Sequence, residues 1–474
     1  MSYKIQEADL LIRETPPDRL TFAIGSGQSA KRRPRAILLV RLLLSDDRGR
    51  TTWGISGDRP SFGWLDKRTG FTPEQKLERL FQLVRGARDI YLNDSFDSPF
   101  EHWLKCHREI VRLGAVQNHE SLSSTYASAL MERAMLDAFC RLHGVSMFDA
   151  LKQGLLNPDF TSLDSALDGI KFTDLLPLQP RTSFHIRHTV GLSDPLRDSD
   201  IAPEQRINDG EPESLEAYAR RDGLRYFKVK IGGNSEQDLE RLERIWSVLV
   251  ELDMPTLTLD GNESYTNIDA FACFVELLED RLLGLYQHIA FIEQPLTREL
   301  TMDRETAAVI QRISREKPLI IDEADADLDS FARAREVGYL GVSHKNCKGF
   351  FKSLLNRLRC HVAGPETFQS AEDLSLMPLA PLHQDFAALG ILDISHCERN
   401  GHHYGLGLSH LTKGEQGMAL EHHPDLYIRR GSQVFLNIRQ GQVNCASLQC
   451  PGFGVKFQPD WESLTPLDDW QVLW

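Results

Sequence analysis

The sequence predicts an α/β fold in which parallel strands close into a TIM-type barrel, joined to a smaller α+β unit. Three observations predict it. Between about residues 183 and 396, eight short apolar runs alternate with amphipathic helical patterns. The flanking segments have a different pattern, and polar residues follow one apolar run after another. An open doubly wound sheet is the alternative, and it fits less well because no glycine-rich phosphate loop follows the first run.

Residues 1–180 combine strand and helix patterns. The run AILLVRLLL at 36–44 favours a strand, and apolar residues three and four apart predict a helix over 122–143 that stops at Gly144. Residues 425–474 return to strand pattern and turns but are too few to fold alone, so we expect them to pack onto the first 180 residues. This leaves residues 181–424 for the barrel.

Eight runs are the candidate barrel strands, and a helix is expected after the second of them. This helix has one apolar side and a possible capping box formed by Ser235 and Asp238. The runs, in chain order, are FHIRHTVGL, RYFKVKI, TLTLDGN, IAFIEQP, LIIDEA, YLGVSHK, CHVAGPE and ILDIS.

The composition argues against two classes of partner. The 474 residues hold 54 Lys and Arg against 68 Asp and Glu, a net charge of −14, which disfavours generic nucleic-acid binding. The longest apolar run near the start, residues 36–44, is far shorter than the roughly 20 residues of a membrane span, and no signal-peptide pattern precedes it. Eight cysteines without a CxxC pair are typical of reduced thiols. We therefore expect a cytoplasmic protein that binds neither nucleic acid nor membrane.

Polar side chains stand at the ends of the candidate strands, although a buried parallel strand should be almost wholly apolar. In a barrel these ends meet at one mouth, where active sites of this architecture lie. Because strand side chains alternate, Lys228 and Lys230 point to one side, as do Asp260 and Asn262. The others, in strand order, are Glu293, Asp322, Glu323 and Lys345, with His396 and Glu398 after the eighth run.

Carboxylates from three successive strands, Asp260, Glu293 and Asp322, would converge at this mouth. Three oxygen ligands without Cys or His suit Mg²⁺, whereas zinc prefers softer ligands. A lysine in a dry, cationic setting has a lowered pKa and can act as a base. Metal and base together suit removal of the proton α to a carboxylate, because a divalent cation stabilises the two negative oxygens of the enediolate.

These segments resemble the enolase superfamily, specifically its mandelate racemase/muconate lactonizing branch. FKVKIGG resembles its lysine strand; LDGNESY, FIEQPL and IDEADADL resemble its three metal strands; and VSHKNCKG resembles the strand that carries an opposite-face lysine. SALMERAMLDAFCRLHGVSMFDALK is similar to the helix before the barrel, and PGFGVKF to the terminal return into the cap.

The resemblance implies an α+β capping domain, built from the N-terminal region and the C-terminal return, that closes a modified (β/α)7β barrel. It places Mg²⁺ on Asp260, Glu293 and Asp322. It also makes Lys230 and Lys345 the two acid/base groups and Lys228 a group that stabilises charge.

The sequence departs from the family pattern in three places. Lys348, Gly349 and Phe350 follow the sixth strand where the family usually has a Gly-Gly pair, and Glu366 stands after the seventh run in place of a histidine. The stretch HCERNGHHYGLGLSH is rich in histidine, and His402 and His403 are either substrate contacts or part of a solvated loop. We expect Asn262, Glu323, Glu366, His396 and Glu398 to orient the ligands and lysines or to contact substrate.

Each of these features has a plainer interpretation. A single carboxylate after a strand often caps a turn or a helix, and a lysine pair can protect a sheet edge. His344 and Lys348 lie beside Lys345, so either could be the acting residue. The glycine-containing segment 22–36, with the cationic residues Lys31, Arg32, Arg33 and Arg35, suits a loop that closes over an acidic substrate, or simply a solvated loop. Trp53, Phe62 and Trp64 belong to a second glycine-rich segment that would either cover the site or supply interface or core residues.

The leading hypothesis is a Mg²⁺-dependent racemase, epimerase or cycloisomerase that abstracts the α-proton of a small-molecule carboxylic acid. Dehydration of a sugar acid or hydroxy acid is the enzymatic alternative, and it requires a general acid such as Glu366, Glu398 or His396. A catalytically inactive binding homologue is the alternative from another class. A homo-oligomer is expected from base rates alone.

Overall fold

The computed structural model describes residues 1–474 except 22, 25–27, 30–34 and 472–474. In this described part, eight parallel strands follow one another around a barrel, and the last pairs back with the first. This confirms the predicted fold class. The strands are β7 (Ser183–Val190), β8 (Tyr226–Lys230), β9 (Thr256–Asp260), β10 (Ile289–Glu293), β11 (Leu319–Ile321), β12 (Gly341–His344), β13 (Phe368–Ala371) and β14 (His396–Arg399).

The first six strands lie where the sequence predicts them, but the predictions for the last two are wrong. The CHVA half of the seventh run ends helix α13 (Phe350–Ala363), and the apolar part of the eighth run ends α14 (Ala380–Leu392). Short apolar runs of this kind fit the end of a helix as well as a strand; Cys360, Ile391 and Leu392 are buried in their helices, whereas Val362 is exposed. The true strands, FQSA and HCER, lack the Val and Ile that mark a buried strand.

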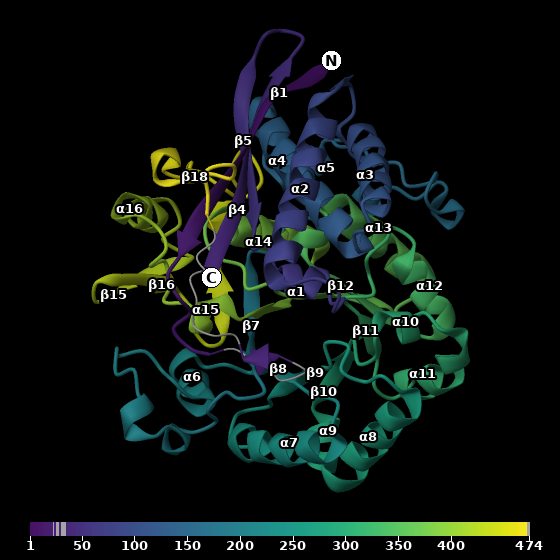
Figure 1. Cartoon of the computed structure of the whole chain (residues 1–474), viewed down its shortest axis with the longest axis vertical. Helices are drawn as coiled ribbons and strands as arrows, with labels where there is room; N and C mark the ends of the chain where they lie inside the picture. The colour runs from purple at the N-terminus through teal and green to yellow at the C-terminus, as the bar shows by residue number, and fades with distance from the viewer. Residues whose placement is uncertain (22, 25–27, 30–34, 472–474) are drawn as a thin grey trace.

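Helices connect consecutive barrel strands and surround the barrel (Figure 1). The N-cap of helix α7 lies one residue earlier than expected. The side chain of Asn234, and not that of Ser235, accepts the hydrogen bond from the backbone amide of Gln237. The main connecting helices are α6 (Leu215–Asp222), α7 (Ser235–Leu249), α8 (Ile268–Arg281), α11 (Ala307–Ser314), α12 (Ser330–Val337), α13 and α14. None of the described helices is long and apolar enough to cross a membrane.

The cap is an antiparallel sheet with helices against it, drawn at the top of Figure 1. Its long strands are β1 (Tyr3–Thr15), β4 (Arg35–Asp46) and β5 (Thr51–Asp58). Its helices are α2 (Pro73–Leu92), α3 (Pro99–Val116) and α4 (Ser121–His143). Helix α4 confirms the predicted helix and ends at Gly144, whose φ of 68° is the left-handed conformation that glycine adopts readily.

The carboxyl-terminal segment contacts both parts of the molecule. Strand β17 (Gln442–Asn444) pairs antiparallel with the first barrel strand, β7. Strand β18 (Thr465–Pro466) pairs antiparallel with β1, the first strand of the chain. The segment therefore joins the cap sheet to the barrel.

Helix α4 also fixes the loop that follows β12. Glu132 on α4 accepts a hydrogen bond from the backbone amide of Phe351, 2.6 Å from its Oε1, at the start of α13. Gly349 has a φ of +100°, and a Cβ there would lie 2.7 Å from Oε2 of Glu132. Only glycine therefore fits between the cap helix and this loop. The same loop carries Lys345 and Lys348, so the cap helps to position both lysines.

Candidate active site

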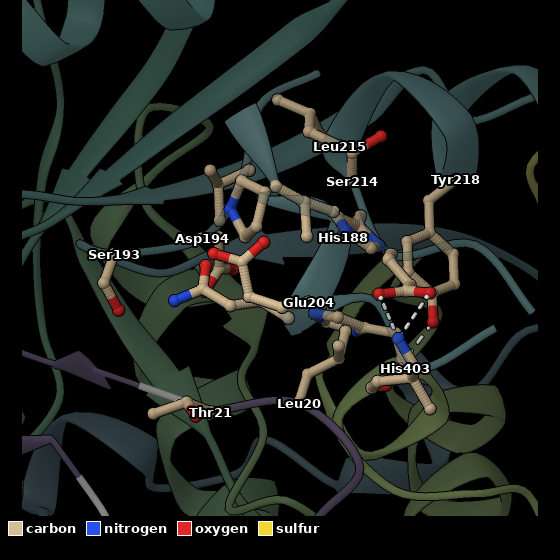
Figure 2. Close-up of a pocket in the computed structure, with 16 residues that line it drawn as sticks. Leu20, Thr21, His188, Ser193, Asp194, Glu204, Ser214, Leu215, Tyr218 and His403 are labelled. Atoms are coloured by element: carbon tan, nitrogen blue, oxygen red, sulfur yellow. Dashed lines mark hydrogen bonds between the residues drawn. The ribbon is translucent and has the colours of Figure 1, made fainter. Parts of the chain in front are cut away.

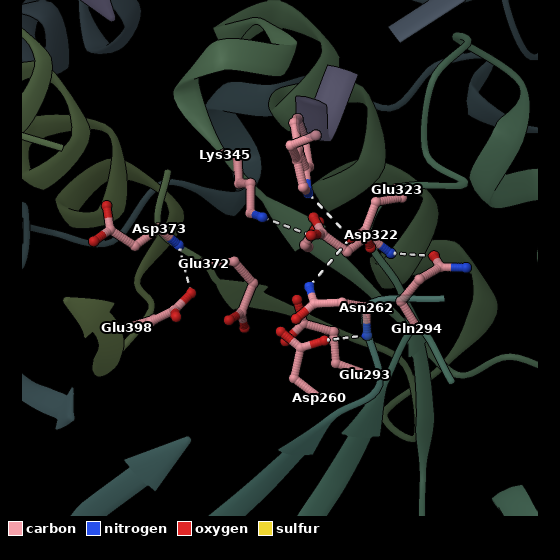
Figure 3. Close-up of polar contacts among 12 residues, drawn as sticks. Asp260, Asn262, Glu293, Gln294, Asp322, Glu323, Lys345, Glu372, Asp373 and Glu398 are labelled. Carbon is pink, nitrogen blue, oxygen red and sulfur yellow. Dashed lines mark hydrogen bonds and ion pairs between the residues drawn. The ribbon is translucent and has the colours of Figure 1, made fainter. Parts of the chain in front are cut away.

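Five buried carboxylates converge at the carboxyl ends of the barrel strands (Figure 3). The ammonium group of Lys228 lies among four of them. Its Nζ is 2.9 Å from Oδ2 of Asp260, 2.7 Å from Oε2 of Glu293, 2.6 Å from Oε2 of Glu372 and 2.9 Å from Oε2 of Glu398. The fifth carboxylate, Asp322, follows β11. The structure thus brings together the three carboxylates that the sequence suggests as metal ligands.

Two further lysines flank these carboxylates from opposite sides. Lys230 in β8 places Nζ 2.6 Å from Oδ2 of Asp260, and Lys345 after β12 places Nζ 2.5 Å from Oδ2 of Asp322. Strands β9, β10 and β11 carry the carboxylates, and β8 and β12 border this trio on its two sides. A substrate held at the carboxylates would therefore have one lysine on each side.

A fourth lysine, Lys348, contacts the same carboxylate as Lys345, that of Asp322. Nζ of Lys348 lies 2.9 Å from Oδ1 of Asp322, 2.5 Å from its backbone oxygen and 2.7 Å from Oγ of Ser343. Lys348 is buried and stands where the family usually has a glycine. The floor of the site below Asp322 is therefore more cationic than the family pattern implies.

The charges of the site shift several pKa values. Burial alone would lower the pKa of Lys345, but the negative charge of Asp322 outweighs it and the pKa is raised. Burial would raise the pKa of Asp322, yet Lys345 and Lys348 hold it well below its usual range. With the protein's own charges, Lys345 is therefore an ammonium ion. The sequence led us to expect a lowered lysine pKa, and this arrangement differs because the lysine pairs directly with a carboxylate.

Glu293 stands out among the carboxylates. Burial raises its pKa, as do the nearby charges of Asp260 and Glu372. Its close partner among the described residues is the ammonium group of Lys228, an ion pair of 2.7 Å at Oε2, and neither oxygen accepts a hydrogen bond of good geometry. Because Lys228 is shared by four carboxylates, its single charge does not balance theirs, and a further cation would stabilise the group. The oxygen-only donor set of Asp260, Glu293 and Asp322 therefore fits a hard divalent cation.

Neighbouring polar groups orient the carboxylates. The backbone amide of Asn262 donates to Oδ1 of Asp260 over 2.8 Å, and its side-chain amide donates to Oε1 of Glu323 over 3.2 Å. The side-chain oxygen of Gln294 accepts hydrogen bonds from the backbone amides of Asp322 and Ala324, at 2.8 and 3.1 Å. Gln294 therefore fixes the turn that carries Asp322.

The cap covers the site through helix α1 (Phe62–Leu65). The ring of Trp64 lies beneath Nζ of Lys345, 4.4 Å from the ring centroid. Trp53, by contrast, lies in β5 under the guanidinium group of Arg41, 4.5 Å from its centroid. Of the three residues that the sequence left open, Trp64 covers the mouth. Lys31, Arg32 and Arg33 lie outside the described residues.

The chain's family follows from comparison with known proteins. The family model for enolase C-terminal domain-like proteins matches residues 212–461. The chain belongs to the enolase superfamily. Solved structures of the mandelate racemase/muconate lactonizing branch, to which the sequence motifs point, share its fold. The search of curated protein sequences gives no match.

Solved structures of other superfamily members share the whole fold at low sequence identity. A 2-chloromuconate cycloisomerase from Rhodococcus opacus 1CP is 15% identical, with a TM-score of 0.61 over 97% of this chain and 98% of that one. A mandelate racemase/muconate lactonizing enzyme from Roseovarius nubinhibens ISM is 17% identical, with a TM-score of 0.60 over 99% and 100%. A dipeptide epimerase from Cytophaga hutchinsonii, complexed with Mg and D-Ala-L-Val, is 13% identical, with a TM-score of 0.59 over 98% of each chain.

Two residues of this enolase-superfamily site escaped the sequence analysis. Arg187 in β7 forms a buried ion pair with Glu372, which directly follows β13. Arg187 also donates to Oγ of Ser370 over 3.0 Å and to the backbone oxygen of Ala371 over 2.7 Å. An arginine inside a buried strand was the available signal for this pair. Glu372 stayed hidden because the seventh strand was predicted several residues too early.

Two of the expected site residues, Glu366 and His396, lie outside the group of carboxylates and lysines at the barrel mouth. Glu366 precedes β13, is exposed, and lies 3.8 Å from Arg335. His396 is the first residue of β14 and stacks on Tyr226, with ring centroids 4.9 Å apart, at the amino ends of the strands. Glu366 and His396 were expected to contact the ligands, lysines or substrate. Both lie near the amino ends of their strands, away from the barrel mouth, so this expectation is wrong for them. Glu398, two residues further on, does point into the group and accepts a hydrogen bond from Oγ1 of Thr189 over 2.8 Å.

Proposed function

We propose that the protein is a Mg²⁺-dependent racemase, epimerase or cycloisomerase that acts on a small-molecule carboxylic acid. One observation carries the proposal: Lys230 and Lys345 flank the carboxylates Asp260, Glu293 and Asp322 from opposite sides. Removal of a proton from one side of a carbon and its return from the other side requires an acid/base group on each side. Epimerases and cycloisomerases are among the proteins with this fold.

Each group has a defined task in this proposal. Asp260, Glu293 and Asp322 hold Mg²⁺, which when bound stabilises negative charge on the substrate carboxylate. One lysine acts as the neutral amine and takes the α-proton. The lysine on the other side, as an ammonium ion, donates a proton to the opposite face of the same carbon, so the proton count is unchanged.

The test is α-proton exchange in D₂O. The protein is incubated with Mg²⁺ and with hydroxy acids, sugar acids, N-acylamino acids and dipeptides, and each α-proton is followed by NMR. Deuterium incorporation that needs both Mg²⁺ and the lysines supports the proposal, with the double variant Lys230→Met/Lys345→Met as control. Failure of Mg²⁺ to bind, measured by calorimetry, would contradict it and favour an inactive binding homologue.

Dehydration is the less favoured alternative. It needs a general acid beside the leaving group, and of the sequence candidates only Glu398 lies in the group. Burial would raise the pKa of Glu398, but Lys228, Lys230 and Lys345 lower it, so the carboxylate is ionised and cannot donate a proton. Elimination of water in the exchange assay, seen as a new vinylic or keto product, would reverse this order.

A further inference from the structure

Three histidines gather on the outer side of the barrel, away from the carboxylates. His188 lies in β7, and His402 and His403 lie in the short helix α15 (Gly401–Tyr404) that follows β14. The pairing of β14 with β7 closes the barrel and brings these residues together. Arg187 and Thr189, the neighbours of His188, contact Glu372 and Glu398 inside the barrel. His188 therefore points outward, because strand side chains alternate.

His402 offers a lone pair to this group. Its Nδ1 lies 2.7 Å from the backbone oxygen of Arg399. Since a carbonyl oxygen only accepts, Nδ1 carries the proton and Nε2 of the neutral ring is unprotonated. Metal-binding histidines are commonly oriented by such a bond from their other ring nitrogen.

The spacing of the ring nitrogens suits a shared ion. Nε2 of His402 lies 3.4 Å from Nδ1 of His188, and without an ion it accepts a hydrogen bond from that nitrogen. Two imidazole nitrogens bound to one tetrahedral Zn²⁺, each at about 2.0–2.1 Å, lie roughly 3.3 Å apart. One ring nitrogen from each of the three histidines lies within 4.8 Å of the others.

His403 completes the group. Its ring stacks on His188, with centroids 4.0 Å apart. In the described part of the chain, its buried Nε2 has no hydrogen-bond partner. Stacked core histidines are the plainer interpretation of this cluster, and buried ring nitrogens without a partner also occur at His396 and His423. A stacked core does not, however, require ring nitrogens of three histidines to lie within 4.8 Å of one another.

A cavity gives the group room for another ligand. His188 and His403 line a cavity of about 550 Å³, together with Tyr218, Asp194 and Glu204 (Figure 2). Three histidines beside an open position are the arrangement of zinc sites that bind water or substrate. The carboxylates on the cavity wall favour a cation there.

We propose that His188, His402 and His403 bind a divalent transition-metal ion of the zinc type, with its fourth position open to the cavity. Imidazole nitrogens suit Zn²⁺, Co²⁺ and Ni²⁺, whereas the carboxylate cluster suits Mg²⁺. The chain thus has two chemically separate metal sites, and the histidine site does not rest on the proposed α-proton chemistry.

Co²⁺ is the probe that tests the site, because its visible absorption reports nitrogen ligation and low coordination number. The chelator-treated full chain is titrated with Co²⁺ in the presence of Mg²⁺. We expect one intense visible band that saturates at one ion per chain. The variants His188→Ala and His402→Ala should weaken binding by at least about 10-fold. Asp322→Asn, which alters the carboxylate site, and His396→Ala, which alters a buried histidine elsewhere, should leave the band unchanged.

Two results would overturn the proposal: no band in the wild-type chain, or a band that His402→Ala preserves. Loss of the band in Asp322→Asn would assign it to the carboxylates instead and would also overturn it. If a histidine variant fails to fold, X-ray absorption of the zinc-loaded wild-type chain decides the question. Coordination of the zinc ion by three imidazole nitrogens supports the site, and coordination by oxygen atoms alone excludes it.

Discussion

Trp64 donates a hydrogen bond from Nε1 to Oε1 of Glu323, and this 3.1 Å contact ties the cap to the barrel mouth. Both side chains are buried. Burial raises the pKa of Glu323, and the positive charge of Lys67 partly opposes this shift. The contact therefore helps to satisfy a carboxyl group that would be costly to bury alone.

Removal of this hydrogen bond should loosen the cap. Trp64→Phe keeps an aromatic ring under Lys345 but leaves the Glu323 oxygen with one donor fewer, so the free energy of unfolding should fall by about 1–3 kcal/mol. Urea denaturation measures it. Trp53→Phe is the matched control, and an equal loss in both variants would mean that ring size rather than the hydrogen bond matters.

Glu293→Gln should have opposite effects on stability and on metal binding. The substitution removes one of the four carboxylates that share the ammonium group of Lys228, at a position where burial and the charges of Asp260 and Glu372 raise the pKa. Stability in the presence of a chelator should therefore rise by about 1–3 kcal/mol, while Mg²⁺ binding measured by calorimetry is lost. If Mg²⁺ affinity is unchanged, Glu293 is not a ligand.

Arg187→Met should be strongly destabilising. It leaves Glu372 in a fully buried position without its arginine partner, a change that typically costs about 3–5 kcal/mol. The double variant Arg187→Met/Glu372→Gln should recover much of this loss in thermal and chemical unfolding. A double variant as unstable as the single one would show that the arginine acts through its bonds to Ser370 and Ala371.

Lys345 and Lys348 can be distinguished by variants of each. If Lys345 is the acid/base group, Lys345→Met should reduce α-proton exchange of one enantiomer by about 10²–10⁴-fold. Lys348→Met should mainly strengthen Mg²⁺ binding, because it removes a positive charge that lies 2.9 Å from Oδ1 of Asp322 and competes for this carboxylate. The opposite result, with exchange lost only in Lys348→Met, would move the catalytic assignment to Lys348.

Glu132 should make stability depend on pH. Burial raises its pKa from 4.5 to about 8. The folded protein therefore keeps a proton that the unfolded chain loses near pH 4.5, so stability should fall as the pH rises from about 4.5 to about 8. The slope from this group is at most about 1.4 kcal/mol per pH unit. Glu132→Gln should flatten this part of the profile relative to wild type, and an unchanged slope would mean that Glu132 is ionised in the fold.

Strands β9 to β11 could be predicted because their interiors are apolar and their polar residues come at the ends, and β7 and β8 because apolar and polar residues alternate in them. The same alternation correctly placed Lys228 and Lys230 on one side. Strand β14 could not be predicted this way, because two of its four residues, Glu398 and Arg399, are charged. The burial of Glu398 is compensated by Lys228 in β8, and that of Arg399 by Asp385 in helix α14. A local pattern does not reveal a charge whose partner comes from another element.

The histidine cluster shows the same limit. His402 and His403 are visible in the sequence as part of a histidine-rich stretch, but His188 lies more than two hundred residues away in an ordinary strand pattern. Only closure of the barrel brings the three together. The convergence of the five carboxylates, including Glu372, likewise depends on the register between strands.

The pairing of β18 with β1 also has a consequence for the order of folding during synthesis. Residues 3–15 are translated long before residues 465–466, yet Leu11 and Ile12 pair with Pro466 and Thr465. This edge of the cap sheet therefore stays open until residues 465–466 have been translated. Strand β1 must remain protected from aggregation over that interval, and its pairing with β4, formed early from nearby sequence, supplies part of that protection.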